Sequence, residues 1–204
     1  KALAPRVSAR MGKALYELGG NNGMIVSKHA NIDLAVRGIV FGAVGTAGQR
    51  CTTLRRLIVH TSVYDALITK LKSAYASLPV GDNFKEETLV GPLINQESAD
   101  RMQSALQQAK DKGYTVHGGE VVEGCTVRPA IVEATEQCDL VKTETFAPIL
   151  YVLKYTDLDE AISIHNAVPQ GLSSCIFTDN VQEAETFTSA VGSDCGIVNI
   201  NIGP

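Results

Sequence analysis

The sequence predicts an α/β fold in which a mostly parallel sheet carries helices on both faces, a Rossmann-like arrangement. Short apolar runs that suit strands alternate with stretches whose apolar residues recur at helical spacing. Strands separated by helices usually run parallel, with helices on both faces of the sheet. The 204 residues are 45% hydrophobic, enough for one sizeable core, and no internal repeat or long Gly/Ser linker divides them.

Strand and helix patterns alternate in the first half of the chain. The expected elements are a strand at 24–26, a helix at 31–44, a strand at 54–60 and a helix at 62–77. Turn residues at 78–83 interrupt the alternation. A polar helix then covers 95–112, with Asn95 as its N-cap and Gly113 as its stop.

The second half repeats the alternation after two short strands. The expected elements are strands at 114–117, 128–133 and 148–155, a helix at 157–167, a strand at 173–178, a helix at 181–191 and a final buried strand at 196–202. The two short strands flank the turn Gly118-Gly119-Glu120. We expect residues 18–204 to form one domain, with residues 1–17 ending in a helix that stops near Glu17.

Charge and cysteine content exclude several classes of function. A net charge of −4 without any Lys/Arg run argues against a nucleic-acid partner. The five cysteines are spread out without a Cys-x-x-Cys pair and the four histidines are scattered, so we expect reduced thiols and no metal. No apolar stretch approaches the roughly 18 residues of a membrane span, and a cytoplasmic protein is expected.

Cys51 is the first candidate for chemistry. It lies in Gly-Thr-Ala-Gly-Gln-Arg-Cys-Thr-Thr at 45–53, where a helical pattern gives way to a strand. The cation of Arg50 would favour a thiolate, and the glycines would let the backbone pass close to a substrate. A thiol in such a turn can be a nucleophile, although a buried structural cysteine is the ordinary alternative.

Glu17 is the second candidate. It opens Glu-Leu-Gly-Gly-Asn-Asn at 17–22, beside apolar Leu18 and a flexible Gly-Gly turn. A carboxylate in this setting could act as a general base, whereas the plain alternative is a solvated glutamate at a helix end.

These two motifs, followed by Thr-Glu-Thr-Phe-Ala-Pro at 143–148, resemble the aldehyde dehydrogenase superfamily in content and order. Together with Gly-Ser-Asp-Cys-Gly-Ile-Val-Asn at 192–199, the residues of these motifs are similar to those of the antiquitin-like branch, the L-aminoadipate-semialdehyde (piperideine-6-carboxylate) dehydrogenases. The likeness runs through nearly the whole chain. It implies the fold of that superfamily's catalytic domain and NAD as cofactor.

The resemblance also implies roles for seven residues. Cys51 would attack the aldehyde, and Glu17 would activate the water that releases the acid. Glu144 would bind the ribose next to the nicotinamide, with Phe146 and Leu18 beside that ring. For the substrate, Thr52 would be a contact, and Arg50 would either hold a remote carboxylate or anchor its loop to backbone carbonyls.

The superfamily's dinucleotide-binding turn, its oxyanion-stabilising asparagine and a C-terminal substrate loop would lie outside these 204 residues, so we expect no turnover by this piece alone. The complete protein would be a homo-oligomer, commonly a tetramer, that oxidises aminoadipate semialdehyde in lysine catabolism. Three alternatives stay open: a dehydrogenase for another aldehyde, a cysteine hydrolase or acyltransferase that pairs Cys51 with a histidine such as His29 or His60, and a non-catalytic interaction domain.

Overall fold

The structure, a computed structural model, describes residues 2–169 and 171–204 and centres on a seven-stranded sheet of order β3-β6-β7-β2-β1-β8-β9. Its strands are β1 (Asn22–Val26), β2 (Leu54–His60), β3 (Thr115–Gly118), β6 (Ala130–Glu133), β7 (Ile149–Tyr155), β8 (Ser173–Phe177) and β9 (Ile197–Ile200). All neighbouring strands are parallel except β3 and β6. The predicted α/β fold with a mostly parallel sheet is therefore confirmed.

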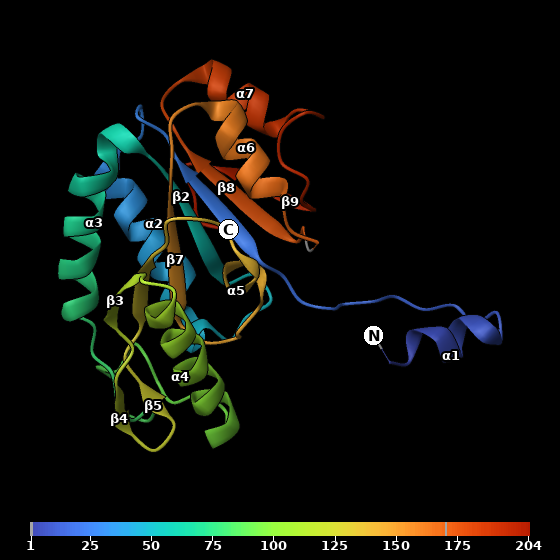
Figure 1. The fold of residues 1–204 in the computed structure, drawn as a ribbon, viewed down its shortest axis with the longest axis vertical. Helices are drawn as coiled ribbons and strands as arrows, with labels where there is room; N and C mark the ends of the chain where they lie inside the picture. Colours follow the sequence, from blue (N-terminus) through green and yellow to red (C-terminus); the bar gives the residue numbers. More distant parts are fainter. Residues whose placement is uncertain (1, 170) are drawn as a thin grey trace.

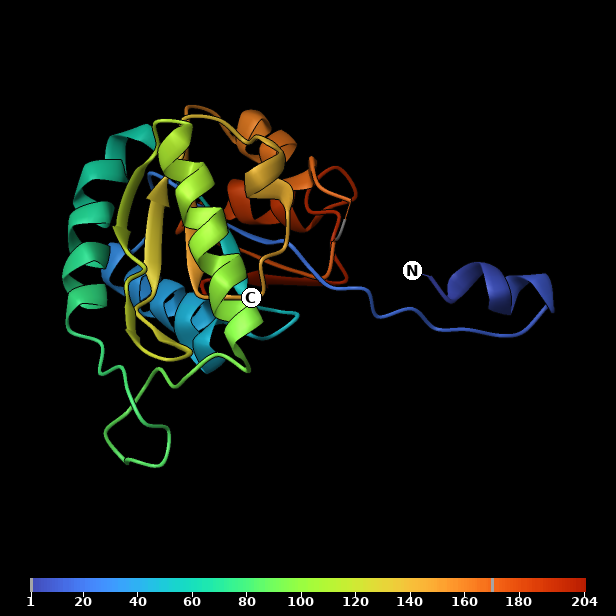
Figure 2. The same ribbon diagram turned by 60° about the horizontal axis from the view of Figure 1, so that its bottom comes forward.

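Helices cover both faces of this sheet (Figure 1). The helices of the structure are α1 (Ala4–Ala9), α2 (Ile32–Val44), α3 (Thr61–Ala76), α4 (Gln96–Asp111), α5 (Asp139–Lys142), α6 (Leu158–Asn166) and α7 (Val181–Thr188), with a 3-10 turn, η1, at Gly45–Gly48. Of these, α1 lies away from the sheet (Figure 1). Parallel strands are joined by right-handed crossovers. The connection β1-α2-β2 runs along the sheet in one direction, and β7-α6-β8 and β8-α7-β9 run in the other. The crossover helices α6 and α7 therefore lie on the face opposite α2, and Figure 2 shows α3 and α4 on either side of the β3 end.

The middle of the sheet forms the core. Strands β1 and β8 are buried at every position, and β2 is buried at every position except His60. Near-continuous burial is typical of parallel strands between two helical layers, and each fully buried Leu or Ile contributes about 1.5–3 kcal/mol. Two arginines, Arg55 and Arg56, are buried within β2 and break its otherwise apolar run.

Side-chain caps define the two helices that the sequence predicted most clearly. Asn31 Oδ1 accepts a hydrogen bond from Leu34 N at 3.1 Å, and α2 begins at the next residue. Asn95 Oδ1 accepts from Ser98 N at 2.9 Å at the start of α4. The predicted stop, Gly113, adopts a φ of 79°, which glycine tolerates better than other residues.

Two short pieces of structure escaped the sequence prediction. Strands β4 (Val121–Glu123) and β5 (Thr126–Val127) form a hairpin outside the main sheet, and α5 is a single helical turn. Elements this short span too few residues to display a hydrophobic period.

Two predictions about the ends of the sheet domain are wrong. The opening helix ends at Ala9 rather than near Glu17, and residues 12–20 have no helix or strand. Because α1 contains no buried residue, no packed core extends it, and isolated short helices are marginal. The last strand is not buried either, since β9 is the outermost strand and Ile197 and Ile200 remain 45% and 40% exposed.

Candidate active site

The three sequence motifs meet at the amino edge of the sheet. Leu18 and Gly20 lie just before β1, Cys51 lies before β2, and Glu144 and Phe146 lie before β7. The strands β7, β2 and β1 are adjacent and parallel. The segments that enter them therefore lie side by side, although 127 residues separate Glu17 from Glu144 along the chain.

Asn22 holds the Cys51 turn in place. Its Nδ2 donates to Cys51 O and to Thr53 O, both at 2.8 Å. Its Oδ1 accepts from Ser173 N at 3.0 Å. Because Asn22 is 1% exposed, these bonds face little competition from water, and they tie the turn to both β1 and β8.

The backbone that leads to Cys51 is unusually tight. Thr46 and Ala47 adopt φ values of 54° and 51°, and Gly48 follows at 69°. A Cβ on Gly48 would lie 2.5 Å from the carbonyl carbon of Ala147. Glycine is therefore required where this loop touches the third motif, and the chain then turns so that Cys51 is exposed.

Arg55 occupies the space between the three loops. Its Nη2 lies 3.0 Å from both Glu144 Oε1 and Arg50 O. Its Nε reaches Gly20 O at 3.3 Å, and its Nη1 reaches Gly48 O at 3.5 Å. Burial lowers the pKa of the Arg55 guanidinium, and the neighbouring Glu144 and Cys51 partly offset that effect.

Glu144 keeps one oxygen free of hydrogen bonds. Its Oε1 accepts from Arg55 and from Gly20 N at 3.2 Å, whereas Oε2 has no hydrogen-bond donor among the described residues. The Phe146 ring lies 5.4 Å from the Arg55 guanidinium carbon and is 38% exposed, and Leu18 is 47% exposed. A carboxylate with a free oxygen, together with exposed apolar side chains on the same two loops, suits a ligand that has both hydroxyls and a flat ring.

The remaining predicted residues are less closely connected. Glu17 is exposed in the extended segment 12–20 and makes no hydrogen bond or salt bridge within the described part of the chain. Thr52 is half-buried in the same turn as Cys51. The Arg50 guanidinium lies 5.4 Å from the centre of the Phe41 ring, and its side chain donates to no backbone carbonyl of the described residues. The loop anchoring considered for Arg50 is therefore performed by Arg55.

The geometry opposes a cysteine hydrolase that uses His60 or His29. His60 ends β2, whereas Cys51 precedes that strand, so roughly 20 Å of strand separates them. His29 likewise follows the carboxyl end of β1. Neither imidazole can serve as a base for the Cys51 thiol in this fold.

Asn22 and Arg55 are residues of this candidate site to which the sequence assigned no role. Asn22 belongs to the Glu-Leu-Gly-Gly-Asn-Asn motif but received no role. The available signal for Arg55 was the Arg55-Arg56 pair inside an apolar strand, since a buried charge needs partners.

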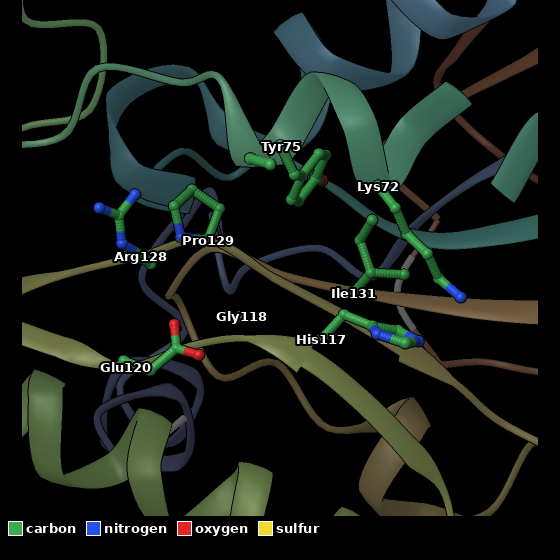
Figure 3. Close-up of a pocket in the computed structure, with 9 residues that line it drawn as sticks. Lys72, Tyr75, His117, Gly118, Glu120, Arg128, Pro129 and Ile131 are labelled. Carbon is green, nitrogen blue, oxygen red and sulfur yellow. The ribbon is translucent and has the colours of Figure 1, made fainter. Parts of the chain in front are cut away.

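A separate cavity of about 420 Å³ lies between α3 and the β3–β6 strands (Figure 3). Lys72, His117 and Arg128 line it, away from the three motifs. Glu133 accepts bonds of 2.8 Å from both Lys72 and His117. Burial would raise the pKa of Glu133, but these bonds and one from Tyr64 outweigh it and lower the pKa to about 2. Two of the polar side chains beside this cavity, those of Lys72 and His117, are thus already bonded to Glu133.

Neither a membrane-spanning helix nor a metal-ligand cluster occurs among residues 2–169 and 171–204. No helix there reaches the length and apolarity needed to cross a bilayer. No three His, Cys, Asp or Glu side chains gather there in a way that could hold a metal ion.

Comparison with known proteins gives one consistent family. The model of the "Aldehyde dehydrogenase family" matches residues 1–204. "Aldehyde dehydrogenase family 7 member A1" of Brassica napus is 48% identical over 199 residues, which cover 96% of this chain and 40% of that protein. "Alpha-aminoadipic semialdehyde dehydrogenase" of Bos taurus is 45% identical over 206 residues, with coverages of 99% and 38%.

A solved structure agrees with these matches. The structure of PnpE in complex with nicotinamide adenine dinucleotide superposes with a TM-score of 0.93 at 29% identity, over 98% of this chain and 42% of that one. The present chain thus spans about 40% of the length of the curated relatives it matches. The family match over every residue, the relatives and the shared fold agree: the chain belongs to the aldehyde dehydrogenase family.

Proposed function

We propose that the complete protein is an NAD-dependent dehydrogenase that oxidises L-2-aminoadipate 6-semialdehyde to 2-aminoadipate in lysine catabolism. The observation that carries the proposal is an exposed Cys51 thiol at the same sheet edge as the Glu144 carboxylate, with Arg55 bonded to the loops of both. The printed name of the Bos taurus relative supports the choice of aldehyde.

Cys51 and its own peptide group would perform the first step. The thiolate would attack the aldehyde carbon and convert the carbonyl oxygen into an oxyanion. Arg50 O accepts from Arg55 Nη2 at 3.0 Å and from Thr53 N at 3.1 Å, which fixes the peptide that joins Arg50 to Cys51. In a trans peptide the N–H points opposite to the C=O, so the Cys51 N–H is directed away from Arg55 and is available to the oxyanion.

The residues around Glu144 fit NAD. Glu144 Oε2 could accept hydrogen bonds from ribose hydroxyls, and the exposed side chains of Phe146 and Leu18 could pack beside a nicotinamide. When bound, NAD supplies the acceptor for the hydride that leaves the Cys51 adduct. The chain's own contribution is to orient the ring and to exclude water from it.

Glu17 is the proposed base for the last step. After oxidation the acyl group remains on Cys51 as a thioester, and a water molecule must lose a proton as it attacks. Glu17 precedes β1 and its exposed carboxylate has no partner in the described chain that would occupy it. The proposal requires Glu17 to approach the thioester, and residues 12–20 contain no helix or strand that would oppose a change of backbone.

Arg50 and Thr52 are the proposed substrate contacts. The semialdehyde carries a carboxylate at the end remote from the aldehyde, and a guanidinium can hold it through paired hydrogen bonds. The Arg50 guanidinium lies over the Phe41 ring and has no carboxylate partner among the described residues, so it is available to a substrate carboxylate. Thr52, next to Cys51, would contact the substrate near the reacting carbon.

The domain division and the assembly are also proposals. We assign residues 18–204 to the catalytic domain and 1–17 to the link with a cofactor domain, because α1 stands away from the sheet (Figure 2). A homotetramer is supported by β9, whose outer edge could pair with another subunit. The five unpaired cysteines support a reducing, cytoplasmic location, and the acidic charge speaks against nucleic acid.

The test is NADH formation by the full-length protein. We expect a kcat/KM about a hundredfold higher for aminoadipate semialdehyde than for a neutral aldehyde of similar length, or about 2.7 kcal/mol. Cys51→Ser should abolish turnover, and Cys125→Ser, which changes a cysteine outside the three motifs, should preserve it. Equal kcat/KM values for the two aldehydes would overturn the assignment of aminoadipate semialdehyde as the substrate. No NADH from any aldehyde, although the cofactor binds, would overturn the proposed dehydrogenase activity.

A further inference from the structure

Arg55 joins the loops that carry all three motifs. Its donors reach the carbonyls of Gly20, Gly48 and Arg50 as well as the Glu144 carboxylate. These groups belong to the segments before β1, before β2 and before β7. One planar guanidinium thus sets the spacing between three loops that are distant in the sequence.

Stability alone does not explain a charge at this position. The Arg55 side chain is 4% exposed and pairs with Glu144, whose side chain is 21% exposed. Removing a guanidinium from water is costly, and apolar residues of similar volume often replace buried ion pairs without loss of stability. A fixed set of directed hydrogen bonds is what an apolar side chain could not supply.

We infer that Arg55 is a positioning residue that fixes the Glu144 carboxylate relative to Cys51. It acts at two places. Together with Gly20 N it occupies Glu144 Oε1, which leaves Oε2 to face the cofactor ribose. Through Arg50 O it orients the peptide whose N–H belongs to Cys51. The inference rests on the proposed function, since the role of Glu144 toward NAD is part of that proposal.

The neighbouring Arg56 provides a matched control. It is also fully buried, but consecutive side chains of a strand point to opposite faces of the sheet. Its partners are Asn21 O and Oδ1, Gln137 Oε1, Ile164 O and His165 O. Within the described residues it makes no hydrogen bond to Glu144, Arg50 or Cys51. Its loss should therefore lower stability without a selective effect on cofactor binding.

The experiment uses the full-length protein and measures NADH binding from the fluorescence of the bound cofactor, beside the KM for NAD. We expect Arg55→Met to raise the Kd for NADH and the KM for NAD about tenfold or more each. Arg55→Lys should restore part of the lost affinity, because one ammonium replaces some of the guanidinium's hydrogen bonds. Arg56→Met should leave both constants within about twofold. Melting temperatures identify variants that fold poorly, and Arg55→Lys is then the variant that decides.

A double-mutant cycle with Glu144→Gln separates positioning from general destabilisation. If Arg55 acts through Glu144, Arg55→Met should change NADH binding less than about threefold in the Glu144→Gln background. Full additivity, or wild-type binding in folded Arg55→Met, overturns the inference. A wild-type protein that binds NADH but oxidises no aldehyde overturns the proposed function, and Arg55 is then judged by the binding constants. A wild-type protein that binds no NADH overturns both.

Discussion

Asn22 and Cys51 are joined by a 2.8 Å hydrogen bond from the Asn22 side-chain amide to the Cys51 carbonyl oxygen. The same amide nitrogen donates to Thr53 O, so Asn22 holds the turn on both sides of Thr52. Asn22 itself lies in β1, an inner strand next to the central β2. The exposed Cys51 thiol is thus held by a strand that is buried at every position.

Replacement of Asn22 should therefore loosen the Cys51 turn. We expect Asn22→Ala to lower the free energy of unfolding by about 2–4 kcal/mol, because Cys51 O, Thr53 O and Ser173 N each lose a partner in a buried place. Urea unfolding measures this loss, and the alkylation rate of Cys51 reports the change in the turn. Asn199→Ala, which removes one bond to Gly203 O, is the control. Equal losses of unfolding free energy in the two variants would contradict a special role of Asn22 in holding the Cys51 turn.

Gly48 offers a test of how closely the Cys51 loop packs on the third motif. Gly48 and Gly113 both have positive φ values, 69° and 79°, but a Cβ on Gly113 would meet no atom within 4 Å. Gly113→Ala should cost about 1–2 kcal/mol from backbone strain alone. Gly48→Ala should cost about 2 kcal/mol more, since its Cβ would collide with Ala147 and Pro148. Similar unfolding free energies for both variants would show that the loop before Cys51 can shift to accommodate the added Cβ without loss of stability.

Local patterns made most of the fold predictable. Strand β2 has the predicted bounds because its apolar residues, Leu54 and Leu57 to Val59, form a run too short for a helix. The helices α2 and α4 begin one residue after the predicted start of the pattern, because Asn31 and Asn95 are their caps. The predicted end of α1 was wrong because the length of this helix depends on packing, and a local sequence pattern does not show what the helix packs against.

The site was predictable only in part, for a topological reason. Cys51 and Glu144 come together because β2 and β7 are neighbours, and strand order is a long-range property that no local pattern encodes. The composition of β2 indicates two buried arginines. It does not indicate that Arg55 reaches the loops and Arg56 reaches α6. Asn22 belongs to the Glu-Leu-Gly-Gly-Asn-Asn motif, yet its partners lie in the turn before β2 and on β8.

His165 should make stability depend on pH. Burial, with a contribution from Arg56, lowers the pKa of His165 to about 3, far below its unfolded value of about 6.5. Between these two values the unfolded chain binds a proton that the folded chain does not bind, so stability falls as the pH decreases from 6.5 toward 3. The expected slope approaches 1.4 kcal/mol per pH unit in the middle of that window.

The corresponding measurement is urea unfolding at a series of pH values between 4 and 7. His165→Gln should remove this part of the slope, although it lowers stability at pH 7 through the lost bond to Ser193. His29→Gln changes an exposed imidazole and is the control. An unchanged slope in folded His165→Gln would mean that other groups cause the pH dependence.

Arg50 provides the last prediction, on substrate choice. If its guanidinium binds the remote carboxylate, Arg50→Met should lower kcat/KM for the semialdehyde about a hundredfold and change that for a neutral aldehyde little. Arg50→Lys should recover only a fraction, because an ammonium cannot form the paired bonds of a guanidinium. The control is Arg37→Met, which removes a cation of α2 that lines the same pocket as Phe41. Equal losses with both aldehydes would mean that Arg50 serves the structure of the Cys51 loop, in which Arg55 already binds the carbonyls.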